Sequence, residues 1–482
     1  PGGVLVSRGP GLAQLSIALH AARQDSVPLV AIAGQVPSAI IGREAFQEVD
    51  HALVAGAFCK SYLEVRRPEL AGEAVGRAFF LARSGRPGPV LVSIPEDVAN
   101  TAAPRYAPVA QRISQPLPSR SAIVYAAQTL EEAQSIAIVA GGGVLASGAT
   151  KELVLLAERL GAAVFTGFRR CDAYPNDHVL YGGTVPWLPP ALLAPLINAE
   201  VILAIGTRMG EFNSLGYQLG QSNQKIIQID VSAESMSVTP SPDISIIADA
   251  GEAIRAIRRA LPNSRVSLAR ARHASAIAAH SMYLQASTPR IAASADDLVD
   301  MPAAICALHE AIPDGGITVS DAGSFAGYLH RYFRWSHPRT FFGTTSGAMG
   351  YGVPAAVGIK LVTPARPVVA VVGDGGFAMT MSEVRTAVRL GLRSLVFVIF
   401  DNGVYGTIRL HQDRRYPDRS IAVDLGVADL ASVARSLGAE ARTVTSHIAL
   451  GDVLRDALGA STPVVIHALT DARQIDAWVD YA

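Results

Sequence analysis

Oxygen-bearing side chains and glycines gather in one short segment, residues 367–409. Asp374 stands there within Gly-Asp-Gly-Gly, and Asn402 follows it 28 positions later within Asp-Asn-Gly. The carboxylate of Asp374, the side-chain carbonyl of Asn402 and the backbone carbonyl of Val404 are hard oxygen donors of the kind that Mg²⁺ prefers. The glycines let a diphosphate approach the backbone closely. The segment therefore suggests a magnesium–diphosphate site, although a bare Gly-Asp-Gly also occurs in ordinary strand-to-helix turns.

The hydrophobic pattern indicates which elements position these groups. Apolar runs at Val368–Val372 and Leu395–Phe400 predict two buried strands, and the stretch between them predicts a helix opened by the capping-box pattern Thr380-x-x-Glu383. A strand–helix–strand crossover makes the two strands parallel, so their carboxyl ends lie at the same edge of the sheet. Ligands bind at that edge in open α/β sheets. We therefore expect the two polar motifs to lie close together.

This pair of motifs resembles the cofactor motif of thiamine-diphosphate (ThDP) enzymes. The resemblance implies that Mg²⁺ is bound by Asp374, Asn402 and the Val404 carbonyl. Asp401 departs from the Asn of most relatives, and we expect little effect because it only precedes a ligand. The cofactor-binding residues that the resemblance implies in this segment are Gly373, Asp374, Gly375, Gly376, Asn402, Val404, Tyr405 and Gly406.

A second stretch, residues 344–354, resembles the Gly-x-Met-Gly motif of acetolactate synthases and their relatives. By resemblance, the carbonyl of Gly347 accepts a hydrogen bond from the aminopyrimidine of the cofactor, and Met349 wedges beneath the cofactor and bends it. The alternative is that Met349 is ordinary core packing, as a single Met usually is. Ser324 follows another predicted strand, and we expect it to donate to a phosphate.

The N-terminal block closely resembles the pyrimidine-binding domain of acetolactate-synthase-like proteins. The similar segments are Ser7–Gly11, Asp25–Pro37, Arg43–Asp50 and Ser84–Val98. By resemblance, Gln35, Phe46 and Gln47 line the active site. The family's activating glutamate has no counterpart in this sequence. Because the chain begins Pro1-Gly2-Gly3 and at once enters an apolar strand-like run at Val4–Val6, we expect that the N-terminal part of this domain is missing. A non-catalytic relative is the alternative.

Two glycine-containing turns in the middle block, Gly141–Gly143 and Gly206–Arg208, follow predicted strands. The matching domain of acetolactate synthases holds FAD, but the Asp-Asp-Arg of that site is replaced here by Met-Gly-Glu-Phe at 209–212. FAD is therefore not favoured over a structural domain. A nicotinamide-dependent oxidoreductase is a further alternative. It is disfavoured because the sequence lacks a GxGxxG motif with a following acidic residue.

The segment after Asn402 is expected on the substrate side. His411 stands near the position where acetolactate synthases carry a Trp that selects the acceptor, and it is our candidate for a catalytic proton shuttle. His330 and His337 are further candidates, and for each the alternative is a structural or solvated histidine. A basic cluster that could receive a carboxylate or an acyl-CoA phosphate, or form a solvated helix face, consists of Arg409, Arg414 and Arg415.

Short apolar strands alternate with helices along the chain, which predicts an α/β protein with doubly wound parallel sheets. We expect three domains: a pyrimidine-binding domain over residues 1–104 that is truncated at its N-terminus, a central Rossmann-like domain over 121–262, and a diphosphate- and Mg-binding domain over 291–482. The stretches Thr101–Arg120 and Pro262–Arg290 are interpreted as linkers.

Composition narrows the function classes. Lys+Arg and Asp+Glu are both 41, so no global basic field exists to hold nucleic acid or an anionic membrane. No apolar run approaches the length of a membrane helix, and the three scattered cysteines predict a reducing, cytoplasmic location. In the family, different subunits hold the two ends of the cofactor, so the resemblance implies a homodimer or homotetramer with active sites between subunits.

The function that the resemblance implies is ThDP- and Mg²⁺-dependent decarboxylation of a small-molecule 2-oxoacid, with carboligation of the enamine to a second carbonyl compound. The alternatives are a simple 2-oxoacid decarboxylase, a carbon–carbon lyase that acts on an acyl-CoA or a cyclic diketone, and a non-catalytic subunit that binds the cofactor.

Overall fold

The structure is a computed structural model. It describes residues 1–107, 112–221, 223–236, 241–262, 266–289, 298–426 and 428–479, without the side chains at 266 and 267. The chain divides into two compact units, one formed by Pro1–Pro116 with Thr344–Ala348 and the other by Leu117–Gly343 with Met349–Ala482. Within the described residues, the first unit holds one parallel sheet and the second unit holds two.

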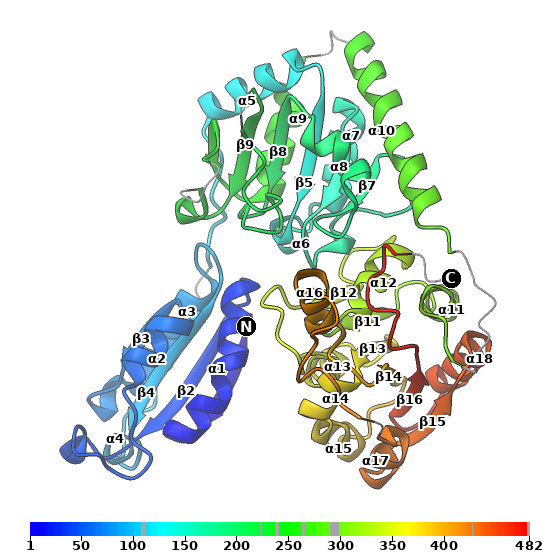
Figure 1. Cartoon of the computed structure of the whole chain (residues 1–482). Helices are drawn as coiled ribbons and strands as arrows, with labels where there is room; N and C mark the ends of the chain where they lie inside the picture. The colour runs from blue at the N-terminus through cyan, green and yellow to red at the C-terminus, as the bar shows by residue number, and fades with distance from the viewer. Residues whose placement is uncertain are drawn as a thin grey trace. The chain divides into compact units, whose positions relative to one another are not determined.

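The first unit is built on a four-stranded parallel sheet with the order β1-β2-β4-β3 (Figure 1). The strands are β1 (Gly2–Val6), β2 (Leu29–Gln35), β3 (Ser61–Glu64) and β4 (Pro89–Pro95). The helices are α1 (Gly9–Gln24), η1 (Ser38–Ile40), α2 (His51–Phe58), η2 (Pro68–Leu70), α3 (Ala71–Arg83) and α4 (Glu96–Ala99). Helix α3 packs on Val30 and Val92, whereas α1 and α2 pack on the opposite face, on Ala31 and Leu91. Both faces of this sheet are therefore covered.

The central domain belongs to the second unit and has a six-stranded parallel sheet with the order β10-β9-β8-β5-β6-β7. The strands are β5 (Ile136–Ala140), β6 (Ala163–Thr166), β7 (Tyr181–Thr184), β8 (Val201–Ile205), β9 (Lys225–Asp230) and β10 (Ile244–Ile247). The helices are α5 (Arg120–Glu132), α6 (Gly142–Ala146), α7 (Thr150–Leu160), η3 (Cys171–Ala173), α8 (Pro190–Ile197), η4 (Ala233–Met236), α9 (Ala250–Ala260) and α10 (Val266–Ala286).

The C-terminal domain has the second sheet of this unit, with the order β12-β11-β13-β14-β16-β15 (Figure 1). The strands are β11 (Ile317–Ser320), β12 (Phe341–Gly343), β13 (Val368–Gly373), β14 (Leu395–Asp401), β15 (Glu440–Val444) and β16 (Val464–Leu469). The helices are α11 (Met301–Ala311), α12 (Phe325–Tyr332), α13 (Gly352–Val362), α14 (Asp374–Thr380), α15 (Ser382–Arg389), α16 (Gly406–Arg415), α17 (Leu430–Ser436) and α18 (His447–Leu458).

Both faces of the C-terminal sheet are buried, which explains why its central strands are almost wholly apolar. Val369 and Val371 of β13 pack with α11, α12 and α18. Ala370 and Val372 of the same strand point the other way and pack with α13, α14 and α15. Because residues of a strand alternate between two buried faces, β13 and β14 carry no polar side chain before Asp401, the last residue of β14. The polar groups of these two strands and of the turns that follow them therefore lie at the carboxyl edge of the sheet.

The predicted fold class is confirmed: the chain has three α/β domains with parallel sheets. The domain boundaries stay a prediction, and the boundary at residue 291 lies outside the described residues. Residues 108–111 of the first predicted linker also lie outside the described residues, as do residues 263–265 and 290 of the second.

The second predicted linker is wrong over most of its length, because α10 fills it. The sequence of this helix is rich in alanine, the strongest helix former. Its buried positions Arg272, Ala276, Ala279, His280 and Tyr283 recur at helical spacing. The periodicity was obscured because Arg and His occupy two positions of the buried face. Arg272 is accommodated there because its guanidinium donates to the carbonyls of α5 and the residue after it.

The predicted capping box is also wrong. Helix α14 begins directly at Asp374, and the next helix, α15, has Met381 as its N-cap without a side-chain hydrogen bond. The hydroxyl of Thr380 instead donates to the carbonyl of Gly350, at 3.1 Å. The sequence pattern is typical of a helix cap, but the Thr380 hydroxyl instead forms its hydrogen bond with a residue of another loop.

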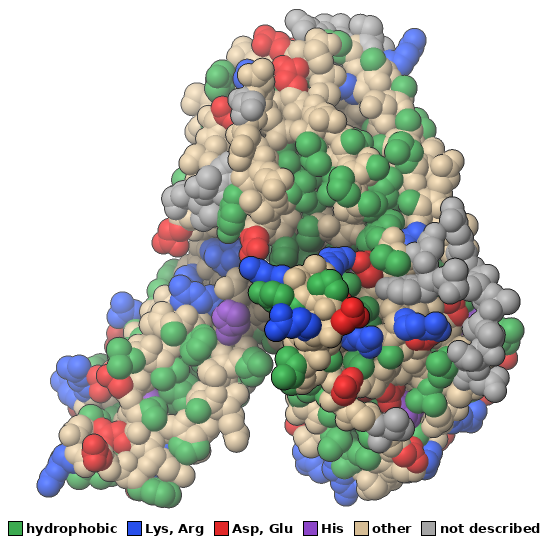
Figure 2. Space-filling model, in the orientation of Figure 1, with side chains coloured by type: hydrophobic (Ala, Val, Ile, Leu, Met, Phe, Trp, Pro, Cys, Tyr) green, Lys and Arg blue, Asp and Glu red, His purple; other side chains and the backbone are tan. Residues whose placement is uncertain are grey.

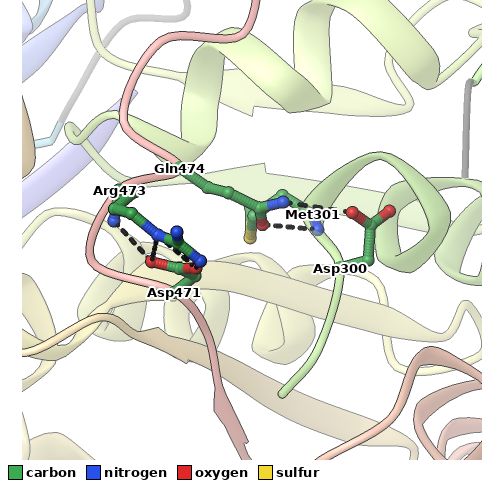
Figure 3. A network of polar contacts seen from close by, with 5 residues as sticks. All are labelled: Asp300, Met301, Asp471, Arg473 and Gln474. Carbon is green, nitrogen blue, oxygen red and sulfur yellow. Dashed lines mark hydrogen bonds and ion pairs between the residues drawn. The ribbon is translucent and has the colours of Figure 1, made fainter. Parts of the chain in front are cut away.

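The C-terminal segment returns along its own domain to the start of α11. Val299 N donates to the Leu469 carbonyl, at 2.8 Å. Farther on, the side chain of Gln474 donates from Nε2 to Asp300 Oδ2, at 3.1 Å, and accepts from Met301 N, at 3.0 Å (Figure 3). Asp300 also caps α11 through Oδ1. The segment is thus fixed at the N-terminus of α11. None of the described helices of the protein is long and apolar enough to cross a membrane.

Candidate functional site

The carboxyl ends of β13 and β14 lie side by side, with Gly373 paired with Phe400. Asp374 follows the first strand and opens α14, and Asn402 follows the second. The two polar motifs that the sequence predicts to be neighbours therefore meet at one edge of the sheet.

Two carboxylates, those of Asp374 and Asp401, lie close enough at this edge for each to affect the pKa of the other. Burial and then the neighbouring Asp401 carboxylate raise the pKa of Asp374 to about 7. Burial alone would also raise the pKa of Asp401, but the hydrogen bond from His467 holds it below its usual range. Two carboxylates so close need a cation or a proton between them. Asp401 therefore brings a second carboxylate to this edge, and the expectation that its departure from Asn has little effect stays a prediction.

The turn that follows β14 is held by the segment around Asp424. Asn402 Oδ1 accepts a hydrogen bond from Val404 N, at 3.2 Å, and the Val404 carbonyl accepts from Gly406 N, at 2.8 Å. Val404 also pairs with Asp424 in an isolated antiparallel bridge. A carbonyl oxygen has two lone pairs, so both oxygens keep one for a ligand. The turn fixes these two oxygens in place before any ligand binds.

The donor set at this edge suits a hard cation. No group of three His, Cys, Asp or Glu residues in the described part of the chain could hold a metal. A cation bound here would depend on one or two carboxylates together with amide and backbone oxygens. Mg²⁺ accepts such oxygens and keeps waters or phosphate oxygens in its remaining positions.

Four of the predicted cofactor-binding residues pack against one another. A Cβ added to Gly406 would lie 2.5 Å from Ser324 Oγ, and one added to Gly375 would lie 2.8 Å from the Tyr405 ring. Both distances are below any normal contact. These glycines are thus required by side chains of the protein itself, and the same packing brings the end of β11 to the start of α16.

The loop that contains Met349, within the predicted Gly-x-Met-Gly motif, has two glycines with positive φ, Gly347 (+68°) and Gly350 (+80°). An added Cβ at Gly347 would meet nothing, whereas Gly350 is buried and donates from its N–H to Asp321 Oδ2, at 3.0 Å. Met349, between them, is half-buried. Sequence reasoning took only Ser324 from the segment that follows β11 and gave Asp321 no role of its own, although an acidic residue directly after a predicted strand was a usable signal. Burial raises the pKa of Asp321.

The candidates in the N-terminal block lie in the first unit. The Gln35 side chain is buried; it donates to the Val49 carbonyl, at 2.8 Å, and accepts from Val36 N, at 2.9 Å. Phe46 is 78% exposed. Gln47 has a positive φ of 64°, and its carbonyl accepts from Gly9 N. Gln35 therefore supports the local backbone, while Phe46 presents its ring to the outside of this unit.

The histidine candidates differ in their surroundings. His411 is exposed on α16. His330 is fully buried, with Nδ1 2.9 Å from the Cys171 sulfur and its ring stacked on Trp187. Burial lowers the pKa of His330 well below its ordinary value. His337 lies 2.9 Å from Asp314 in a surface ion pair. The prediction of a proton shuttle is thus disfavoured for His330, which has no access to solvent.

Much of the predicted basic cluster is already paired with acids. Arg409 forms an ion pair with Asp413, one turn along α16, at 3.4 Å. Arg414 forms one with Asp476 of the C-terminal segment. On the face shown in Figure 2, basic and acidic side chains are interspersed over the C-terminal domain. The arrangement favours the solvated helix face over a site for a carboxylate or an acyl-CoA phosphate.

The glycine turns of the central domain pack directly against each other. Gly143 N donates to the Gly206 carbonyl, at 2.9 Å. A Cβ on Gly141 would lie 2.4 Å from the Gly206 carbonyl oxygen, and one on Gly143 would lie 2.6 Å from Gly206 Cα. Asn213 links the neighbouring loops by accepting from Phe168 N and donating to the Thr207 hydroxyl. Loop-to-loop packing accounts for these glycines without a nucleotide.

Comparison with protein families covers all three domains. Residues 1–54 match "Thiamine pyrophosphate enzyme, N-terminal TPP binding domain", residues 123–257 match "Thiamine pyrophosphate enzyme, central domain", and residues 321–468 match "Thiamine pyrophosphate enzyme, C-terminal TPP binding domain". The last match contains both polar motifs of the candidate site.

Curated relatives match nearly the whole chain. An acetolactate synthase of Arthrospira platensis is 30% identical over 476 residues, which are 96% of this chain and 81% of the relative. A probable acetolactate synthase large subunit of Methanocaldococcus jannaschii is 29% identical, over 97% of this chain and 81% of the relative. A sulfoacetaldehyde acetyltransferase of Castellaniella defragrans is 28% identical, over 95% and 80%.

Solved structures share the fold. A thiamine diphosphate-dependent 4-hydroxybenzoylformate decarboxylase of Rhodococcus jostii RHA1 has a TM-score of 0.85 at 23% identity, over 97% of this chain and 87% of that chain. A benzoylformate decarboxylase of Polynucleobacter necessarius has the same TM-score at 22% identity, over 98% and 87%. Taken with the family matches and the relatives, these findings confirm the predicted family. The chain belongs to the thiamine pyrophosphate enzymes and is an acetolactate-synthase-like, thiamine-pyrophosphate-dependent enzyme.

Proposed function

We propose that this enzyme uses ThDP and Mg²⁺ to decarboxylate a 2-oxoacid and to join the remaining fragment to a second carbonyl compound. The observation that carries the proposal is that Asp374 and Asn402 each follow directly after one of the paired strands β13 and β14, at the same edge of the sheet. When bound, ThDP supplies a nucleophilic carbon and an electron sink for the charge left by the departing CO₂. The protein supplies binding, orientation and exclusion of water.

Six of the candidate residues have definite roles in this proposal. Asp374, Asn402 and the Val404 carbonyl would hold Mg²⁺, which would offset the negative charge of the diphosphate. Ser324 donates to a phosphate from the end of β11. Gly347 and Met349 hold the aminopyrimidine and the bend of the cofactor. These roles come from the resemblance and are supported by the packing that gathers Ser324 and the two motifs at one sheet edge.

Carboligation is preferred because acetolactate synthases recur among the relatives that match nearly the whole chain. A second candidate is cleavage or decarboxylation without coupling of two carbonyl compounds. One observation favours it: His411 replaces the Trp that acetolactate synthases place near the acceptor.

Product analysis separates the two candidates. The purified protein is incubated with ThDP, Mg²⁺ and a panel of 2-oxoacids that includes pyruvate, and products are identified by NMR and mass spectrometry. Release of CO₂ with a carbon–carbon coupled product supports the proposal. Release of CO₂ with only an aldehyde supports the second candidate. Absence of CO₂ release across the panel, with ThDP bound, contradicts decarboxylation of these acids.

The remaining part of the proposal concerns assembly and location. We propose a homodimer or homotetramer with active sites between subunits, as the resemblance implies, and mass determination by light scattering tests it. The three cysteines Cys59, Cys171 and Cys306 are free thiols, two of them buried. Free thiols accord with the proposed cytoplasmic location.

A further inference from the structure

The carboxylate of Asp321 connects three loops at the carboxyl edge of the C-terminal sheet. It is buried, with 1% of the residue exposed, directly after β11. Oδ1 accepts from Ala322 N, at 2.7 Å, and from Tyr351 N, at 3.3 Å, while Oδ2 accepts from Gly350 N, at 3.0 Å. Hydrogen bonds from backbone N–H groups to a buried carboxylate are among the stronger ones in proteins. The carboxylate thus ties the 349–352 backbone to the end of β11.

The third loop is the start of α14. A Cβ on Gly376 would lie 2.7 Å from Asp321 Oδ2, and a Cβ on Gly352 would lie 3.1 Å from Asp321 Cβ. Glycine at both positions lets the carboxylate sit between the two loops. Any shift of Asp321 would therefore displace both loops, because a closely packed site does not deform freely.

Gly350 is held from its other side as well. Its N–H donates to Asp321, and its carbonyl accepts from the Thr380 hydroxyl, at 3.1 Å. Thr380 ends α14, the helix that Asp374 opens. The two peptide groups that flank Gly350 are thus held between the residue after β11 and helix α14, which begins at the proposed metal ligand Asp374. Met349 is the residue directly before Gly350.

The central domain fixes the same strand end. Arg169 is buried and donates from Nη1 to Ser320 Oγ, at 2.7 Å, and from Nη2 to the Asp321 carbonyl, at 3.1 Å. The Ser320 hydroxyl also donates to that carbonyl, at 3.0 Å. Asp321 is therefore held at its backbone by one domain while its side chain holds a loop of the other.

We infer that Asp321, together with Thr380, is a positioning residue that fixes Gly350 and so sets the place of Met349 beneath the cofactor. The inference rests on the proposed function, because Met349 can bend the cofactor only when ThDP is bound. It adds two residues to the site, neither of which would touch the cofactor.

The test uses two variants of the full-length protein and two matched controls. Asp321→Asn loses one acceptor toward Gly350, and Thr380→Val loses the hydroxyl with little change of shape. Asp300→Asn alters another buried Asp that accepts backbone hydrogen bonds, at the start of α11 (Figure 3). Thr363→Val removes a hydroxyl-to-carbonyl hydrogen bond at the end of α13. Thr380→Val keeps the test decisive if Asp321→Asn does not fold.

Two quantities are measured without any substrate: the Kd of ThDP in the presence of Mg²⁺, and the rate at which the C2 proton of bound ThDP exchanges with deuterium. We expect Asp321→Asn to slow the exchange about tenfold and Thr380→Val about fivefold, as loss of a charge-assisted or a neutral hydrogen bond predicts. The Kd should change less than about threefold, since the metal-binding oxygens are untouched. Both controls should exchange at the wild-type rate.

A merely structural role would give a different pattern. If Asp321 acts through Met349, adding Asp321→Asn to Met349→Ala should slow exchange little further, because the two changes remove the same effect. Additive effects, or an exchange rate in both Asp321→Asn and Thr380→Val equal to that of the controls, would overturn the inference. If the wild type itself binds no ThDP, the proposed function fails instead.

Discussion

His467 Nε2 lies 2.7 Å from Asp401 Oδ2, and both side chains are buried, with 3% and 7% exposure. Asp401 ends β14 and accepts a second hydrogen bond from Gly403 N, at 3.0 Å. His467 comes from β16, which pairs directly with β14. The departure of Asp401 from the family's Asn is therefore matched by a histidine on the adjacent strand, and the pair supports the turn that carries Asn402.

Removal of that histidine should cost stability. His467→Ala leaves the Asp401 carboxylate buried without its partner, next to Asp374, and we expect a loss of about 3 kcal/mol in the free energy of unfolding. Urea denaturation without added Mg²⁺ and ThDP measures it, since bound ligands would mask the change. His337→Ala is the matched control, because it breaks a surface His–Asp pair that contributes less than about 1 kcal/mol. Equal losses in the two variants would refute the role of the buried pair.

Asp172 should give the protein a stability that depends on pH. Its Oδ2 accepts from Thr340 N, at 3.0 Å, and Phe341 N, at 3.3 Å, and burial raises its pKa to about 6. A carboxyl whose folded-state pKa exceeds its unfolded value stabilises the fold while it is protonated, and this contribution is lost as pH rises from about 4 through 6.

Asp172→Asn removes that titration while it keeps the shape of the side chain. Over the same pH range we expect the wild type to lose up to about 3 kcal/mol relative to the variant. Thermal or urea unfolding of both proteins at several pH values gives the difference. A difference that stays flat between pH 4 and 7, or that grows in the opposite direction, would show that Asp172 is ionised throughout.

Met349 should matter for turnover more than for affinity. Met349→Ala removes the wedge but leaves the oxygens at Asp374 and Asn402, so we expect kcat to fall about tenfold and the Kd of ThDP to rise less than about threefold. The assay uses the 2-oxoacid identified by product analysis. Met379→Ala, an exposed Met on α14, is the control. An unchanged kcat would make Met349 ordinary core packing.

The sequence alone predicted the central strands and the position of Asp374 and Asn402 after two neighbouring strands. Fully apolar runs such as β13 and β14 can only be buried strands in an α/β pattern, and one crossover places Asp374 and Asn402 at one edge. Strands β3, β7, β10, β12 and β15 each lie at an edge of a sheet, where the sequence signal for a strand is weaker. An edge strand needs no long apolar run, as Ser61–Glu64 and Glu440–Val444 show.

What the sequence did not reveal depends on partners far along the chain. His467 is 66 positions from Asp401, and Asp321 is 29 positions from Gly350. Such pairs form because strands that are neighbours in the sheet are not neighbours in the sequence. The hydroxyl of Thr380 was assigned to a local cap for the same reason: its partner lies on another loop.

The account is tested most directly by the dependence of ThDP binding on Mg²⁺ at Asp374. Isothermal titration calorimetry of the full-length protein with ThDP, with and without Mg²⁺, is compared with Asp374→Ala and with Asp314→Ala, an exposed carboxylate in the same domain. We predict that Mg²⁺ tightens binding at least about tenfold in the wild type and in Asp314→Ala, and that Asp374→Ala loses this tightening. Normal Mg²⁺-dependent affinity in Asp374→Ala would contradict the account.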